Sequence, residues 1–348
     1  MDSSIVISTP PHVKSKRTTK SIMLDVIIAL LPAAICGIIF FGVDAFILEI
    51  TAVLGAVATE FVYFFIEKGG FAKKCKNAGA VCKLWWKQFD YTSIVSGLIL
   101  ALIVPPAVAW YEILIGAIFA IAIVKMVFGG TGKNLVNPAC MGRIFIFISF
   151  ASVGTWIAPN FDAINASEIT TGATYLSGAL LKGNGDAMSL VDLLLGSGLA
   201  GCIGETCKIA LLVGYVYLCV RKVIKWWQPL LYVVLSAFLS VCLAAIPEDG
   251  VSAGFDIALF PAFALSGGLM FGAIFMATDY VTSPKGVYGQ LVYYICLAVL
   301  TSLLRYLTGI EVVSFVILIM NLFVPLIDKY IVRKPFGYKR EKKVKEGK

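Results

Sequence analysis

Long apolar segments alternate with short polar ones along almost the whole chain. Each apolar segment runs for about 20 residues, which is the length of a transmembrane helix. A membrane β-barrel would instead show segments of about ten residues with alternating polarity. The pattern therefore predicts an all-α polytopic membrane protein with ten spans, at 21–42, 46–66, 91–107, 109–128, 138–156, 202–220, 227–246, 256–277, 288–308 and 311–332.

The composition agrees with this interpretation. Of 348 residues, 59% are hydrophobic and only 14% are charged, and the mean hydropathy is +0.90. A soluble domain has about 25% charged residues, so a soluble protein is excluded and membrane lipid is the expected surrounding. The net charge of +8 comes from lysines placed beside apolar segments. That placement is a membrane-topology signal, so no nucleic-acid partner is predicted.

Basic residues also orient the predicted spans. They are concentrated before the first span, in the 67–90 loop, in the 221–226 turn and after the last span, and ten spans put all four regions on one side. The opposite side has only Lys182 and Arg305. Because cytoplasmic loops carry the positive excess, we expect a bacterial inner-membrane protein with both termini in the cytoplasm and the 157–190 loop outside.

The long outside loop divides the chain into two sets of five spans. Since five is odd, the two sets have opposite orientations and form inverted repeats. The predicted organisation is a cytoplasmic N-terminal segment (1–20), a first repeat (21–156), the outside loop (157–190), a second repeat (191–332) and a basic cytoplasmic tail (333–348).

Glycine-rich interruptions occur in both predicted repeats, at 129–134, 196–204 and 266–268. In inverted-repeat membrane proteins, interrupted helices expose backbone groups at the functional site, so we predict broken helices here. The alternative is that these glycines only let helices pack closely.

Ionisable residues inside spans are functional candidates, because an unpaired charge at mid-bilayer costs at least about 2.5 kcal/mol. Asp25, Glu60 and Glu205 are the predicted ion-pathway residues. Two alternatives stay open. Glu60 can pair with a neighbouring helix, and Glu205 can form a helix-surface pair with Lys208, three residues later.

Metal and nucleotide chemistry have no signature in this chain. The nine cysteines are scattered without a CxxC pair, and the only histidine is His12. Neither an iron–sulfur nor a zinc site is predicted, and no catalytic residue is assigned. No dinucleotide-binding fingerprint is present, so the chain alone has no complete active site.

The outside loop contains the motif Thr171-Gly172-Ala173-Thr174. The motif resembles the flavin-attachment signature shared by the D subunits of Rnf complexes and the B subunits of sodium-pumping NADH:quinone reductases. The resemblance extends to residues 25–33, 129–139, 201–206 and 276–279, and the chain length is closer to that of the Rnf protein. It implies FMN esterified through its phosphate to Thr174.

The resemblance also implies a function and partners. It predicts a flavoprotein subunit of an ion-translocating ferredoxin:NAD⁺ oxidoreductase, which relays electrons and is coupled to Na⁺ or H⁺ transport. The implied partners are Rnf subunits A, B, C, E and G, together with a flavin transferase that modifies Thr174. Two rivals remain: the quinone-reductase subunit, and a urea- or ammonium-type channel without a redox role.

Asn134 and Asn137 are candidates for a second flavin site. Their spacing predicts both amides on one side of a helical turn at the start of the fifth span, and carboxamides can both donate to and accept from an isoalloxazine edge. The resemblance implies a noncovalent riboflavin at these asparagines, and we expect Asp279 to lie nearby. The alternative is structural: Asn134 caps the helix ahead of Pro138, and the Asn137 side chain links neighbouring backbone segments by hydrogen bonds.

Overall fold

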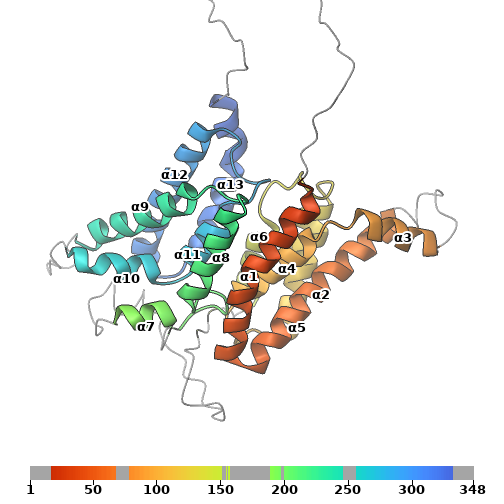
Figure 1. The fold of residues 1–348 in the computed structure, drawn as a ribbon, viewed down its shortest axis with the longest axis horizontal. Helices are drawn as coiled ribbons and strands as arrows, with labels where there is room; N and C mark the ends of the chain where they lie inside the picture. Colours follow the sequence, from red (N-terminus) through yellow and green to blue (C-terminus); the bar gives the residue numbers. More distant parts are fainter. Residues whose placement is uncertain are drawn as a thin grey trace, which may run out of the picture.

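The computed structural model describes residues 17–67, 78–150, 154, 156, 189–196, 200–245 and 256–331. Within these ranges the regular elements are helices (Figure 1). In chain order they are α1 (Thr19–Phe41), α2 (Val43–Phe65), α3 (Ala78–Gln88), α4 (Thr92–Leu102), α5 (Trp110–Phe119), η2 (Ala120–Met126), α6 (Pro138–Ser149), α7 (Leu190–Leu195), α8 (Lys208–Val220), α9 (Trp227–Ala244), η5 (Ile257–Leu259), α10 (Phe260–Leu265), α11 (Leu269–Phe271), η6 (Gly272–Met276), α12 (Val287–Thr308) and α13 (Val313–Tyr330).

Several of these helices are long and apolar enough to cross a membrane. Among the described residues, α1, α2, α9, α12 and α13 meet this criterion individually. A sixth candidate is the pair Ile257–Leu265 and Leu269–Met276, which is bent by 66°. The shorter helices α4, α6 and α8 are also apolar, and α5 continues directly into the π-helix η2. Each of the ten predicted segments therefore contains a helix, and the all-α polytopic class is confirmed.

The predicted 67–90 loop contains a helix that the apolar pattern did not indicate. In α3, Trp86 is exposed, whereas the Trp85 ring packs edge-on against Phe61 of α2 at 5.2 Å between centroids. Val81 is buried and Trp85 half-buried, and these two side chains, four residues apart, lie on the face of α3 that packs against the bundle.

Helix packing repeats between the two halves of the chain. In the first half α2 packs against α4 and α5, and α5 packs against α6. In the second half α9 packs against α10 and α12, and α12 packs against α13. Two further pairs, α1 with α8 and α6 with α13, join the halves. This correspondence is what two structural repeats would produce, and the residue boundaries of the repeats stay a prediction.

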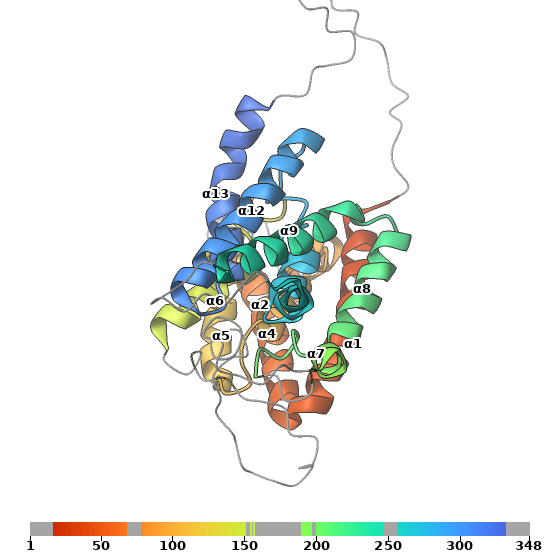
Figure 2. The same ribbon diagram turned by 90° about the vertical axis from the view of Figure 1, so that its left-hand side faces the viewer.

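The two ends of the described bundle lie at the same end of the molecule. Figures 1 and 2 both show the start of α1 and the end of α13 toward the top, with the turn between α1 and α2 at the bottom. An even number of crossings brings the ends together in this way. Which end faces the cytoplasm stays a prediction.

Helices α1 and α8 approach closely where the halves meet. A Cβ atom added to Gly214 of α8 would lie 2.4 Å from the backbone oxygen of Ala29 in α1. Near one end of the same seam, the Asp25 carboxylate pairs with Arg221 at 3.1 Å and accepts a hydrogen bond from the Tyr217 hydroxyl at 3.1 Å. Asp25, predicted as an ion-pathway residue, therefore ties α1 to the end of α8, and its role in ion transport stays a prediction.

Replacing Gly214 with alanine should destabilise this seam. Because the neighbouring atom is backbone, the two helices must separate, and overpacking of this kind lowers the free energy of unfolding by about 1–3 kcal/mol. Thermal unfolding of the detergent-purified protein measures the effect. Gly79→Ala in α3 is the matched control, since no atom lies within 4 Å of its added Cβ. Equal unfolding temperatures for the two variants would contradict the proposed contact.

Candidate functional site

A cavity lies where the two halves of the molecule meet. It encloses about 790 Å³ of empty space, including its mouth, which opens to solvent. Side chains from α1, α4, η2 and the 131–138 segment form one part of its wall, and α8, η6 and the turns that follow these two helices form the rest.

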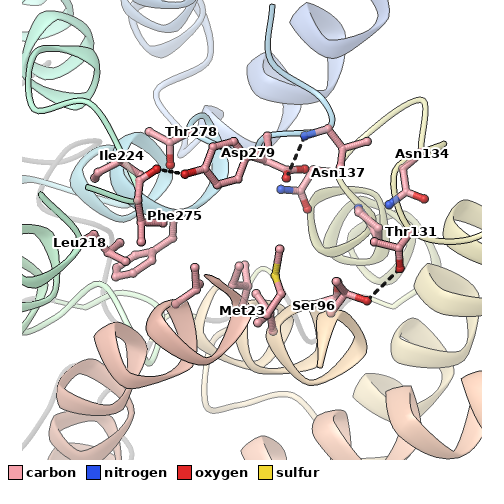
Figure 3. Close-up of a pocket in the computed structure, with 18 of the residues that line it drawn as sticks. Met23, Ser96, Thr131, Asn134, Asn137, Leu218, Ile224, Phe275, Thr278 and Asp279 are labelled. Atoms are coloured by element: carbon pink, nitrogen blue, oxygen red, sulfur yellow. Dashed lines mark hydrogen bonds between the residues drawn. The ribbon is translucent and has the colours of Figure 1, made fainter. Parts of the chain in front are cut away.

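The wall of the cavity has a polar and an apolar side. Figure 3 shows Thr131 and Asn134 at one end and Leu218, Ile224 and Phe275 at the other. This arrangement suits a ligand that has a hydrogen-bonding edge and an apolar body.

Asn134 and Asn137 both line this cavity, as does Asp279. The Asn134 side-chain oxygen is buried and has no hydrogen-bond partner in the structure. Asn137 is the N-cap of α6, where its side-chain oxygen accepts a hydrogen bond from the Ala139 amide at 3.0 Å. Because a buried polar atom is normally paired, the unpartnered Asn134 oxygen marks the part of the wall where a ligand donor would be expected.

The local geometry of these asparagines differs from the prediction in two ways. Residues 134–137 are not helical, since α6 begins at Pro138, so the predicted helical turn is wrong. The capping role predicted for Asn134 belongs to Asn137. The two amides reach the same cavity because an irregular segment, and not helical spacing, brings them there.

Asp279 follows η6 at the edge of the cavity. Its carboxylate accepts hydrogen bonds from the Val281 amide at 3.3 Å and from the Thr282 hydroxyl at 3.0 Å. These bonds hold the turn that closes one side of the cavity, where Figure 3 shows Asp279 close to Asn137.

A buried lysine that the sequence pattern did not single out also lines the cavity. Lys125 lies in η2 with only 1% of its surface exposed. Its ammonium contacts the Thr92 hydroxyl at 2.5 Å, the Ser93 hydroxyl at 2.9 Å and the Glu60 carboxylate at 3.4 Å. Glu60 also accepts a hydrogen bond from Ser93. We call this arrangement the Lys125–Glu60 pair, and it shows that Glu60 is paired with a neighbouring helix. A role of Glu60 in ion transport stays a prediction.

A second, more open pocket lies on the other side of the Lys125–Glu60 pair. It is lined by Glu60, Trp85, Asp90 and Thr131, among others, and Thr131 belongs to the walls of both pockets. Burial raises the pKa of Asp90, but hydrogen bonds from Thr92 and the charge of Lys125 outweigh this effect, so the pKa lies below its ordinary value. Asp90 is therefore ionised at neutral pH and adds negative charge beside the pair.

Three interruptions of helical structure meet near the centre of the bundle. The Ile203 and Gly204 amides donate to the backbone oxygens of Val104 and Leu102, at 3.3 and 2.8 Å. The Lys208 ammonium donates to the Gly267 oxygen at 3.0 Å and to the Glu205 backbone oxygen. Non-helical backbone inside a membrane requires such partners.

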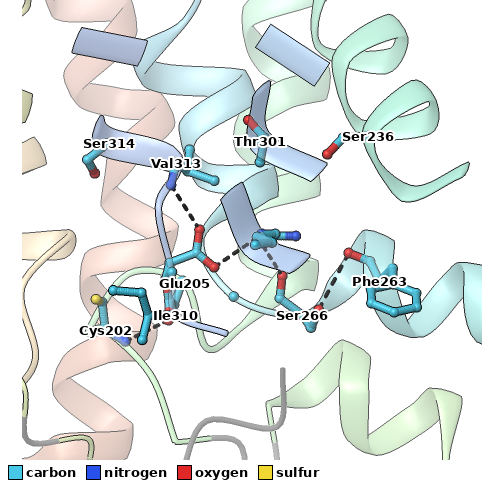
Figure 4. A network of polar contacts seen from close by, with 12 residues as sticks. Cys202, Glu205, Ser236, Phe263, Ser266, Thr301, Ile310, Val313 and Ser314 are labelled. Carbon is cyan, nitrogen blue, oxygen red and sulfur yellow. Dashed lines mark hydrogen bonds and ion pairs between the residues drawn. The ribbon is translucent and has the colours of Figure 1, made fainter. Parts of the chain in front are cut away.

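Charged side chains surround these interruptions (Figure 4). The Glu205 carboxylate accepts a hydrogen bond from the Cys202 amide at 2.9 Å, and Arg305 pairs with Glu311 at 2.8 Å. All of these charged groups are buried. The contacts of Glu205 and Lys208 therefore hold the 202–207 segment, the start of α8 and Gly267 together inside the bundle.

One prediction about this network is wrong. Glu205 and Lys208 do not form a helix-surface pair, because both side chains are buried and the lysine bonds to backbone oxygens instead. Arg305, which the charge count places toward the outside end of its span, is 1% exposed and faces Glu311 inside the bundle. The ion-pathway role predicted for Glu205 stays a prediction.

The predicted flavin-attachment residues Thr171, Gly172, Ala173 and Thr174 lie outside the described residues. Within the described ranges, no three histidine, cysteine or acidic side chains are grouped closely enough to hold a metal ion.

Comparison with known proteins covers almost the entire chain. Residues 6–337 match the NQR2, RnfD, RnfE family. The chain is 36% identical to the D subunit of the Na⁺-translocating ferredoxin:NAD⁺ oxidoreductase complex of Acetobacterium woodii, and the match covers 98% of each chain. It is 34% identical to the D subunit of the proton-translocating ferredoxin:NAD⁺ oxidoreductase complex of Clostridium ljungdahlii, over 96% of each chain.

A third relative is the D subunit of the ion-translocating oxidoreductase complex of Alcanivorax borkumensis, which is 32% identical over 97% of this chain and 98% of its own. The three matches include the segments that build the cavity and the central network. A match of this length and identity identifies the chain as a member of the NQR2, RnfD, RnfE family.

Proposed function

We propose that this protein is the membrane subunit of an Rnf-type ferredoxin:NAD⁺ oxidoreductase, in which it relays electrons and couples their transfer to ion translocation. The observation that carries this proposal is the full-length similarity to the D subunits of two ferredoxin:NAD⁺ oxidoreductase complexes. One of these relatives is named for Na⁺ and the other for protons, so their similarity leaves the transported ion open. The expected partners are Rnf subunits A, B, C, E and G.

The cavity is the proposed site of a noncovalent riboflavin. Asn134 supplies an unpartnered side-chain oxygen and the Asn137 amide lies on the same wall, whereas Phe275 and Leu218 supply apolar surface. An isoalloxazine combines a hydrogen-bonding pyrimidine edge with an apolar ring system, and these two kinds of wall match it. When bound, a flavin accepts one or two electrons. The residues of the chain would hold its edge, shield its ring from water and tune its potential.

The second proposed cofactor is FMN attached through its phosphate to Thr174. Its support is the motif Thr171-Gly172-Ala173-Thr174 together with membership of the family. Small residues beside the acceptor threonine leave room for a modifying enzyme and for a planar group. A flavin transferase acting outside the membrane is therefore an expected maturation partner.

Family membership weighs against a passive channel, which would need neither Thr174 nor an unpartnered amide in a cavity. The quinone-reductase subunit belongs to the same family, so the family alone does not separate the two redox functions. The named relatives favour ferredoxin:NAD⁺ oxidoreduction, because their similarity covers both chains almost completely.

Thr174→Val should abolish covalent flavinylation. Valine matches threonine in shape but has no hydroxyl to esterify. We expect the wild-type protein, coexpressed with a flavin transferase, to give a fluorescent band after denaturing electrophoresis, and the variant to give none. Thr170→Val is the matched control and should retain the band. A wild-type band that stays dark with an active transferase would overturn the covalent-FMN assignment.

Asn134→Leu should release riboflavin from the purified complex. The substitution removes the carboxamide whose oxygen is unpartnered and leaves the ligand edge without a hydrogen-bond partner. This loss costs about 1–3 kcal/mol, or roughly a fivefold to hundredfold weaker affinity. Chromatography of flavins extracted without hydrolysis measures the riboflavin content per complex. Leu135→Ala is the control, because Leu135 is exposed and does not line the cavity. Undiminished riboflavin in Asn134→Leu would remove this residue from the site.

A further inference from the structure

The Lys125–Glu60 pair lies between the two pockets of the first half. Lys125 lines the cavity proposed for riboflavin, and Glu60 lines the more open pocket beyond it. Neither residue lines the other's pocket, and the 3.4 Å ion pair joins them through the wall. The positive member of the pair, Lys125, is therefore on the side of the proposed riboflavin cavity. Its negative partner, Glu60, is on the side of the outer pocket.

The surrounding residues hold the lysine in this position. Thr92 and Ser93, at the start of α4, both accept hydrogen bonds from its ammonium, and the Thr92 hydroxyl in turn donates to Asp90 at 2.6 Å. With three oxygen partners the ammonium is fully satisfied, and with 1% exposure it has no access to bulk water. Its charge is therefore screened far less than that of a surface lysine.

We propose that Lys125 and Glu60 set the reduction potential of the flavin bound in this cavity, and that they act in opposite directions. This inference rests on the proposed riboflavin site. A one-electron reduction adds one negative charge to the bound group before any proton joins it, and the electron is supplied by a donor of lower potential. The Lys125 cation stabilises that added charge, whereas the Glu60 carboxylate opposes it.

The geometry determines which of the two effects is larger. Lys125 lines the cavity and Glu60 stands behind it, so the cation is the closer charge and the pair as a whole favours reduction. Asp90 and Glu67 are the other acidic groups lining the outer pocket, and they lie on the same side as Glu60. Their negative charge adds to the effect of Glu60 and limits how far the lysine can raise the potential.

The test is a redox titration of the purified complex with dithionite, in which the absorbance of the noncovalent flavin is followed. All variants carry Thr174→Val, which removes the covalent flavin proposed for this chain. We expect Lys125→Met to make reduction at least about tenfold less favourable and Glu60→Gln to make it more favourable. Lys125→Arg keeps the charge and should stay close to the parent.

A double variant keeps the test valid if Lys125→Met alone does not fold because Glu60 is left buried without its partner. Lys125→Met/Glu60→Gln removes both charges, and such replacements of a buried pair are often tolerated. Comparison of this double variant with Glu60→Gln then isolates the contribution of the lysine. The double variant should be harder to reduce than Glu60→Gln.

Lys285→Met is the matched control, because Lys285 is exposed and lines neither pocket. It should leave the potential unchanged. Riboflavin that is bound but titrates at the same potential in every variant, or shifts in the same direction in Lys125→Met and Glu60→Gln, would overturn the electrostatic role and leave the riboflavin site intact. Absence of riboflavin from the parent complex would overturn both proposals.

Discussion

Unpaired backbone in an apolar environment is the constraint on which this structure depends. Three helices are interrupted where the halves meet, and each interruption exposes amides and carbonyls that lipid cannot satisfy. The protein pairs them with one another and with buried side chains: Gly204 bonds to Leu102, and Lys208 bonds to Gly267. A contiguous apolar core of both halves then packs around this polar centre.

The same constraint explains why buried charges are numerous in so apolar a chain. Lys208, Arg305 and Glu205 would each be costly alone, yet each has a partner near the interruptions. The asparagines beside the cavity illustrate the same need to pair buried polar groups. Where α6 begins, the Asn137 side chain satisfies the helix terminus, whereas the side-chain oxygen of Asn134 has no partner. Two asparagines only three residues apart thus differ in role: one caps a helix, and the other is the residue of the proposed site whose oxygen is unpartnered.

The sequence allowed the helical class, the ten apolar segments and the grouping of Asn134, Asn137 and Asp279 to be predicted. Segment length and composition decide the first two, and family resemblance suggested the third. Lys125 was missed because it is a single charge in the apolar stretch Ala120–Met126, where hydropathy averages conceal it. The pairing of Arg305 was not predicted, because only the fold shows that Glu311 lies beside it inside the bundle.

The cavity is bordered by two π-helices, η2 and η6, in which Val127 and Ala277 bond to oxygens five residues earlier. A π-turn accommodates one residue more than an α-turn does. The direction of Lys125 is therefore set by how many residues are wound into η2, as well as by their identity. Loss of one residue from this segment would let an α-turn replace the π-turn, so that Lys125 would point in a new direction while the helix beyond stays close to its present register. The composition of the wall would hardly change, but its charged and apolar sides would no longer face the same space.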